Sequence, residues 1–282
     1  MSLLIEFAVK MTCKSCVDAV SEKLKNVKGV ENFDIDLDKG IVLVETELPS
    51  SYVQDQIEST GRVAVINGYG SRLSRNTSGV NTAAVAILGG TVGYSTGGIR
   101  GIVRFIQADP DMCVIDGTID GLTPGKHGIH VHECGDLSNG CESVGNHFDL
   151  SHGKHGDPSS PAGERHTGDL GNIEAGADGR SIFRIKDRLL KVSDVIGRSV
   201  VVTQNEDDCG KGSNEKSKID GNSGNRLACG IISRAAGLFQ NTKKICACDG
   251  VTIWDERNVP AAGASRREFA ERKKEADSCC AR

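Results

Sequence analysis

The residues "HGIHVHECGD" (127–136) carry the clearest sign of how the larger part of this chain folds. Apolar and polar residues alternate here, as on a β-strand with one buried face, so His130 and His132 point to the same side. Similar short runs, such as "TAAVAILGG", "RSIFRIKD" and "RSVVVTQ", recur from Val80 to about Gly237 between glycine-rich connections. This pattern is typical of an antiparallel barrel or sandwich.

Residues 1–70 show a different pattern, in which strands and helices alternate. "LLIEFAV" and "RVAVING" have the composition of strands, and "GVENFDIDLDKGIVLVET" predicts a hairpin that turns at Lys39 and Gly40. "VDAVSEKLKNV" places its apolar residues at helical spacing, and "SSYVQDQIESTG" predicts a second helix that begins at a serine and ends at a glycine. The order βαββαβ predicts a ferredoxin-like α+β domain.

The chain of 282 residues is therefore expected to divide into four segments. These are the ferredoxin-like domain at 1–70, a polar linker at 71–79, an all-β domain at 80–237 and a largely irregular tail at 238–282. The net charge of −4 argues against a nucleic-acid partner. No apolar run is long enough for a membrane anchor, and "MSLLIEFAVK" lacks the basic leader of a signal peptide. We expect a cytoplasmic protein, in which eleven cysteines favour metal or redox chemistry over a disulfide framework.

Cys13 and Cys16 lie where the first predicted strand meets the first predicted helix. The positive end of the helix, together with Lys10 and Lys14, favours thiolates at this position. Two thiolates with no histidine or carboxylate beside them suit Cu(I), although a Cys-x-x-Cys alone also fits half a zinc site or a redox pair. "MTCKSC" within a βαββαβ order resembles the heavy-metal-associated domains of copper chaperones and copper-pumping ATPases. That resemblance implies a Cu(I) site at Cys13 and Cys16.

Six groups that can bind a metal fall within about 40 residues of the all-β region: His130, His132, His147, His155, His166 and Asp169. Nitrogen and oxygen ligands of this kind suit zinc or Cu(II). Three of them, His147, His155 and His166, lie in a connection, residues 136–168, that is too long for an ordinary loop, and such loops are usually functional. A buried metal site is therefore expected at the ends of these strands.

"GIHVHECGD", "GNHFDLSHGKHG", "RHTGDLGNI", "EDDCGKGSNEKSK" and "GNSGNRLACG" resemble copper–zinc superoxide dismutases across residues 80–237. The resemblance implies a Greek-key β-barrel that binds zinc through His147, His155, His166 and Asp169. It also implies a copper site at His130, His132 and His147, and a disulfide between Cys141 and Cys229. Asp207 matches the aspartate that links the two metal sites, and Arg226 matches the arginine that steers the anionic substrate.

One position departs from the dismutase pattern. The fourth copper histidine would align with Thr203, and no histidine follows His166. A copper ion that cycles between oxidation states needs four nitrogens to hold Cu(II) in a tetragonal field. The three remaining histidines are then a vestigial copper site, and no catalytic residue is expected.

The tail contains Cys246 and Cys248 in "NTKKICACDGVTIWDER" (241–257), too close together for a relaxed disulfide. The combination of an N-terminal thiol pair, a dismutase-like body and this Cys-x-Cys tail resembles the copper chaperones for superoxide dismutase over the full length. That resemblance implies that the chain binds Cu(I), docks on the dismutase as a heterodimer, inserts copper and promotes oxidation of its disulfide. The implied docking face is Gly135, Ile196, Gly197, Ile231 and Ser233. The same face could form a homodimer, and the resemblance also allows the mitochondrial intermembrane space as a location.

Two other functions remain open at this point. The chain could be a superoxide dismutase with its own copper-loading domain, which Thr203 argues against and the retained Arg226 mildly favours. It could instead be a passive buffer for copper and zinc, but that leaves the dimer face and the tail pair unexplained.

Overall fold

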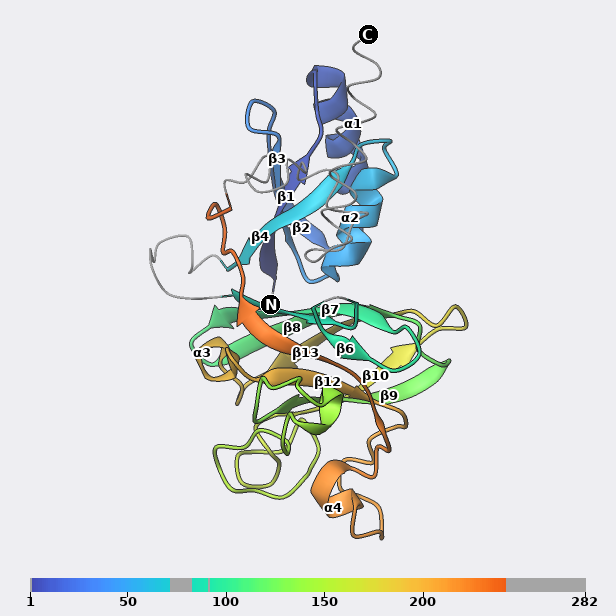
Figure 1. Cartoon of the computed structure of the whole chain (residues 1–282). Coiled ribbons are helices and arrows are strands. Elements are labelled where there is room, and N and C mark those ends of the chain that lie inside the picture. Colours follow the sequence, from blue (N-terminus) through green and yellow to red (C-terminus); the bar gives the residue numbers. More distant parts are fainter. Residues whose placement is uncertain (1, 72–82, 91, 242–282) are drawn as a thin grey trace.

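The computed structural model of this chain describes residues 2–71, 83–90 and 92–241. The predicted linker beyond Ser71 and the part of the tail that holds Cys246 and Cys248 lie outside the described residues. Figure 1 shows the described part as a small α+β domain stacked on one side of a larger β-barrel.

The N-terminal domain has the predicted βαββαβ order. Its elements are β1 (Leu3–Val9), α1 (Lys14–Lys25), β2 (Val30–Asp36), β3 (Ile41–Thr46), α2 (Ser50–Glu58) and β4 (Ala64–Gly70). The sheet is antiparallel in the order β2-β3-β1-β4, so β1 is an inner strand and every one of its residues is buried. Helix α1 packs its buried Val20 and Leu24 against this sheet, and the ferredoxin-like prediction is confirmed.

The second domain is an antiparallel, nearly closed barrel, and the predicted all-β fold is confirmed. Its strands are β5 (Ala83–Leu88), β6 (Tyr94–Ser95), β7 (Arg100–Asp109), β8 (Met112–Asp120), β9 (Gly125–His132), β10 (Asp169–Ala175), β11 (Ser181–Asp187), β12 (Ser199–Thr203) and β13 (Arg226–Arg234). They pair in the order β10-β9-β12-β13-β5-β7-β8-β11, with β6 added to β13. The crossover neighbours β9–β12 and β13–β5 are those of a Greek-key barrel.

Two long connections leave the barrel beside the strand ends that carry the predicted ligands. Residues 133–168 join β9 to β10 and contain a short 3₁₀ helix, η2 (Gly140–Glu142). Residues 204–225 join β12 to β13 and contain α4 (Ser217–Asp220), while α3 (Val192–Val195) precedes β12. Because β9 ends at His132 and β10 begins at Asp169, the barrel itself positions both ends of the histidine-rich loop. Among the described residues, no helix has the length and apolar character needed to cross a bilayer.

Candidate metal centres

Cys13 and Cys16 lie at the N-terminal end of α1, at the end of the domain away from the start of β1. Their Sγ atoms are 3.7 Å apart, and both side chains reach solvent. The loop is held from behind by a hydrogen bond from the Lys10 backbone N–H to the Val63 carbonyl, 3.0 Å long. Two thiol sulfurs this close, in an accessible loop, can bind one soft ion between them.

The Cys16 thiol is tuned to ionise near neutral pH. Its pKa is lowered to about 6, first by the backbone N–H of Thr12 and then by the side chain of Arg62. Arg62 was not identified as a site residue from the sequence, because it lies 46 positions beyond Cys16 and is brought beside it by β4. The only hint of this role in the sequence is that Arg62 is a basic residue just before the last strand of the domain.

Asp169 is the centre of the predicted zinc group. Its Oδ1 lies 2.8 Å from His147 Nδ1, 3.1 Å from His155 Nδ1 and 3.3 Å from His166 Nδ1. The four predicted zinc residues are therefore in contact, although residues 147–169 come from a long loop and the start of β10. Among the described residues, one set of metal-compatible atoms lies within 4.8 Å of one another: it consists of His130, His147, His155 and Asp169, and does not include His166.

Asp207 orients two of these rings from behind. Its Oδ1 accepts a hydrogen bond from His155 Nε2 at 2.7 Å, and its Oδ2 accepts one from His130 Nε2 at 2.9 Å. With both Nε2 atoms bonded to Asp207, the Nδ1 atoms of His155 and His130 face inward. The buried Nδ1 of His130 has no hydrogen-bond partner among the described residues, and that of His155 lies 3.1 Å from Asp169 Oδ1, so both nitrogens face the group that could bind a metal.

The charges of this group are set by burial and by mutual contact. Burial opposes protonation of His155, but Asp169 and Asp207 overcome it and raise its pKa to about 9. Burial alone would raise the pKa of Asp169, yet its contacts with His147, His155 and His166 hold that pKa far below the usual value. The carboxylate therefore stays ionised and adds negative charge where a divalent cation would bind.

The three histidines of the predicted copper site are also gathered together. The rings of His130 and His147 are stacked with centroids 4.0 Å apart, and the His132 ring lies 4.9 Å from that of His147. His132 Nδ1 bonds to the Gly145 carbonyl at 3.0 Å, which leaves its buried Nε2 without a partner. Thr203 is buried nearby, and its hydroxyl donates to the Gly128 carbonyl at 3.2 Å.

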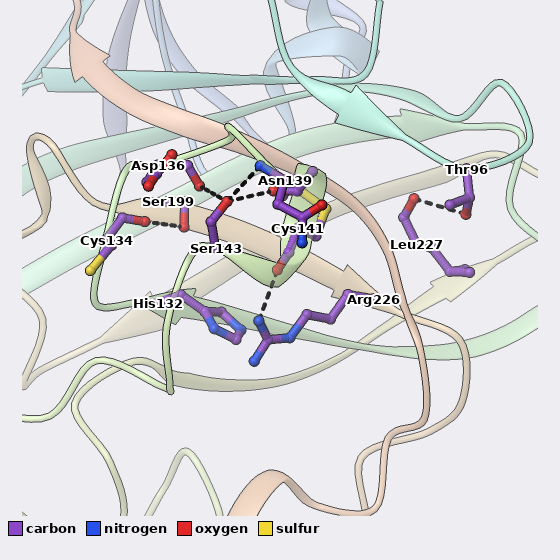
Figure 2. The surroundings of a disulfide bond; sticks show 12 residues. Thr96, His132, Cys134, Asp136, Asn139, Cys141, Ser143, Ser199, Arg226 and Leu227 are labelled. Atoms are coloured by element: carbon purple, nitrogen blue, oxygen red, sulfur yellow. Dashed lines mark hydrogen bonds between the residues drawn. A yellow bond between two sulfur atoms is a disulfide. The ribbon is translucent and has the colours of Figure 1, made fainter.

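A disulfide between Cys141 and Cys229 ties η2 to β13 across 88 residues of sequence. Figure 2 shows Arg226 beside this disulfide and close to His132. The guanidinium of Arg226 donates to the carbonyls of Cys141 and Gly145, both at 2.8 Å. Arg226 therefore holds the disulfide loop against the end of the barrel that carries the histidines.

The residues of the predicted docking face lie near one another on the barrel. A Cβ added to Gly135 would fall 2.3 Å from the Gly197 carbonyl oxygen and 3.1 Å from Ile231 Cγ2. Ile231 and Ser233 are exposed on β13, and Ile196 is half-buried against the barrel core. These side chains form an exposed, partly apolar surface, with the free and exposed Cys134 at its edge.

Comparison with known proteins gives matches for both domains and for the whole chain. Residues 6–62 match the heavy-metal-associated domain, and residues 99–232 match the copper/zinc superoxide dismutase (SODC) family. The chain is 55% identical to the human copper chaperone for superoxide dismutase over 267 residues, which cover 95% of this chain and 93% of that protein. It is 36% identical to a chloroplastic copper chaperone for superoxide dismutase from rice, covering 90% of this chain and 71% of that protein.

Other relatives match the barrel alone. Superoxide dismutase [Cu-Zn] 5 of Dictyostelium discoideum is 49% identical over 140 residues, which are 48% of this chain and 91% of that protein. Among solved structures, the clock protein EA4 superposes with a TM-score of 0.51 at 37% identity, covering 57% of this chain and 99% of that one. The barrel and the thiol-bearing domain thus have separate counterparts, and the full-length relatives contain both.

Proposed function

The chain belongs to the family of copper chaperones for superoxide dismutase, and from that premise we propose how its own residues carry out the delivery. Cys13 and Cys16 capture Cu(I), the barrel recognises a copper–zinc superoxide dismutase, and Cys246 and Cys248 complete the transfer. The observation that carries this proposal is that an exposed thiol pair and a barrel matching the copper/zinc superoxide dismutase family occur in one chain. We propose that the thiol-bearing domain ends at residue 70, the linker at residue 79 and the barrel domain at residue 237, where the tail follows.

Cys13 and Cys16 can capture Cu(I) because their sulfur atoms are soft ligands and can ionise to thiolates. Thiolates prefer Cu(I) over the harder divalent ions, and the lowered pKa of Cys16 keeps that sulfur ionised at neutral pH. The short distance between the two sulfurs allows one ion to bind both. Because both side chains are accessible, an incoming thiolate can replace them one at a time and remove the ion.

The buried group around Asp169 fits zinc. Three imidazole nitrogens and one carboxylate are a common zinc ligand set, and the Nδ1 atoms of His147, His155 and His166 all lie within 3.3 Å of Asp169 Oδ1. His147, His155, His166 and Asp169 would hold it, with Asp207 orienting His155 from outside. Zinc, when bound, cross-links the long loop to β10 and stabilises the fold.

The copper histidines do not complete a dismutase site. His130, His132 and His147 offer three nitrogens, and the Thr203 hydroxyl is already bonded to the Gly128 carbonyl. A redox-active copper would lack its fourth nitrogen at this position. The barrel is therefore proposed to act in recognition and not in dismutation, with no catalytic residue of its own.

The docking face would pair with one subunit of the target dismutase. Gly135, Ile196, Gly197, Ile231 and Ser233 supply an exposed surface with apolar character on a barrel of the dismutase type. A heterodimer in which this barrel replaces one subunit follows from that likeness. The same face would allow a homodimer when no target is present. We propose the cytoplasm as the site of action, with the intermembrane space of mitochondria as a second location.

The tail pair would act after docking. Cys246 and Cys248 can accept Cu(I) from Cys13 and Cys16 by exchange of thiolate ligands, with no change of oxidation state. If they form a disulfide instead, two target thiols can be oxidised while this disulfide is reduced to two thiols, so electrons and protons balance. The two steps use the same pair of sulfurs.

A transfer assay tests the proposal. Cu(I)-loaded chain is mixed with zinc-loaded, copper-free, disulfide-reduced superoxide dismutase in the presence of a strong Cu(I) chelator. We expect dismutase activity in the mixture and none in a blank of the chain alone. The doubly substituted chain, Cys246→Ala with Cys248→Ala, should lose the transfer, while Cys134→Ala should retain it.

A dismutase with a fused loading domain is the second candidate. The unpartnered buried His130 Nδ1 and His132 Nε2, and Arg226 beside them, favour it. Strong activity in the blank would support this alternative and contradict the chaperone proposal. An inactive mixture in which the dismutase stays copper-free would contradict both.

A further inference from the structure

One outer surface of the barrel is as deeply buried as a core. Residues that alternate with the inward-facing ones on β7 and β8 point out of the barrel, and among them Ile106 and Val114 are 0% exposed and Ala108 is 2% exposed. Their inward-facing neighbours Phe105 and Ile115 belong to the barrel core. The outward residues instead share one apolar cluster with residues of the N-terminal domain, including Val53 and Tyr69. Figure 1 shows the two domains in contact along this side of the barrel.

The centre of this contact is a barrel carboxylate at the start of a helix in the other domain. Asp116 of β8 accepts the backbone N–H of Ser50 at 3.1 Å and the Ser50 hydroxyl at 2.6 Å. Ser50 is the first residue of α2, and the preceding Pro49 provides no side-chain cap. A carboxylate at a helix N-terminus satisfies an otherwise free N–H and interacts favourably with the helix dipole. Asp116 therefore caps α2 from another domain, 66 residues away in the sequence.

Two arginines flank this carboxylate on the neighbouring strands. Arg184 lies opposite Asp116 on β11, and Arg104 lies opposite it on β7. Arg184 donates to Asp116 Oδ2 from Nε at 2.9 Å and from Nη2 at 2.6 Å, and its Nη1 donates to the Thr46 carbonyl of β3 at 3.1 Å. The Arg104 guanidinium lies 5.3 Å from the centroid of the Tyr69 ring.

The row Arg104–Asp116–Arg184 thus crosses three strands of the barrel and contacts three elements of the N-terminal domain. Asp116 and Ser50 are each 1% exposed, so the carboxylate is paired and water is excluded from it. Removing one partner of such a buried charged pair is costly, because the remaining charge loses its compensation.

We propose that this row locks the N-terminal domain onto the barrel, so that the two domains move as one body. Asp116 is the positioning residue of the lock. β1 rises about 3.3 Å per residue, so its far end, where the thiol loop begins, lies about 20 Å from its start, which is the end nearer the barrel (Figure 1). Copper therefore stays at that distance from the barrel until another carrier removes it, and delivery by a swing of the N-terminal domain is excluded. The contacts that form the lock include none of the metal-binding side chains, so the lock can be tested by itself, whereas its consequence for copper rests on the proposed function.

The test is ¹⁵N relaxation and amide hydrogen exchange on the full chain, compared with its Asp116→Ala variant. In the unsubstituted chain, amides of residues 2–71 and of the barrel should report one overall correlation time. In Asp116→Ala, we expect the N-terminal domain to tumble faster than the barrel. The Ser50 amide should also exchange about tenfold faster or more, as loss of a charged hydrogen bond implies.

Asp120→Ala is the matched control. Asp120 lies on the same strand and pairs with Arg180, but both side chains are exposed and that pair does not touch the N-terminal domain. This variant should behave like the unsubstituted chain. If Asp116→Ala fails to fold, Ser50→Ala removes the hydroxyl from the other side while the Asp116–Arg184 pair remains, and a smaller loosening is expected. The proposal would be overturned if the two domains of the unsubstituted chain had different correlation times. It would also be overturned if both domains of Asp116→Ala or of Ser50→Ala kept the single correlation time of the unsubstituted chain.

Discussion

Single side chains set the chemistry of both metal centres. Arg62 lies beside Cys16 and contributes to its lowered pKa, while Asp207 orients His155 and His130 from outside the ligand set. Each acts on its neighbour through charge or a hydrogen bond. Substitution of either residue should therefore change a measurable property of the neighbouring ligand and leave the fold intact.

Arg62→Gln should raise the pKa of Cys16 above its value of about 6, because the thiolate loses a cationic hydrogen-bond donor. The thiolate is present above the pKa and is lost as the pH falls through it. The alkylation rate of Cys16 in reduced, metal-free chain, followed by mass spectrometry from pH 5 to 9, gives this pKa. Lys25→Gln, which removes a cation from the opposite end of α1, serves as the control. An unchanged midpoint in Arg62→Gln would show that the arginine has no part in tuning the thiol.

Asp207→Ala should weaken zinc binding by about 10- to 100-fold, the usual effect of losing a carboxylate that orients a ligand histidine. The measurement is competition against a zinc chelator at pH 7.5. Glu206→Ala is the control, since Glu206 is the preceding residue and its exposed carboxylate pairs only at the surface with Lys126. Equal zinc affinity in Asp207→Ala and Glu206→Ala would contradict the orienting role.

At the level of elements, the chain leaving β13 is attached to the N-terminal domain. Buried Glu6 of β1 accepts the Phe239 backbone N–H at 2.5 Å, and Asn67 of β4 donates to the Asn241 carbonyl at 3.1 Å. Gly237 forms a β-bridge with Tyr69. The starting point of the tail is thus held against β1 and β4, five residues before Cys246.

Gly68→Ala should loosen this attachment, because an added Cβ would fall 2.4 Å from the Gly237 carbonyl oxygen. Amide exchange at Phe239 should become about tenfold faster, as expected when a buried hydrogen bond to a carboxylate is weakened. Gly176→Ala is the control, since its nearest neighbour is the movable Asp178 carboxylate at 3.0 Å. The idea fails if Phe239 remains as protected in Gly68→Ala as in the control.

For the whole molecule, the disulfide is the longest-range covalent constraint among the described residues. It joins Cys141 to Cys229 over 88 positions, and the loop-entropy model assigns a cross-link of that span about 4–5 kcal/mol. Cys141→Ser with Cys229→Ser should lower the free energy of unfolding of the zinc-loaded barrel by an amount of this order. The free energy of unfolding is measured by urea denaturation, followed by far-UV circular dichroism. Cys134→Ser, at an exposed cysteine, is the control. A loss below about 1 kcal/mol would mean that the loop is held by its other contacts, such as those of Arg226.

The order of elements and the groups that could bind metal were readable in the sequence. Alternation along "HGIHVHECGD" assigns His130 and His132 to one face, and helical spacing after "MTCKSC" puts a thiol pair at a helix start, since both depend on local backbone geometry. Such patterns do not predict which other element packs against a given face of a strand or helix. Asp116 meets Ser50, and Asp207 meets both His130 and His155, through contacts between residues 52 to 77 positions apart. Only the packing of one domain on the other, and of one loop on another, brings those charges together, because a buried carboxylate is stable only where a distant partner compensates it.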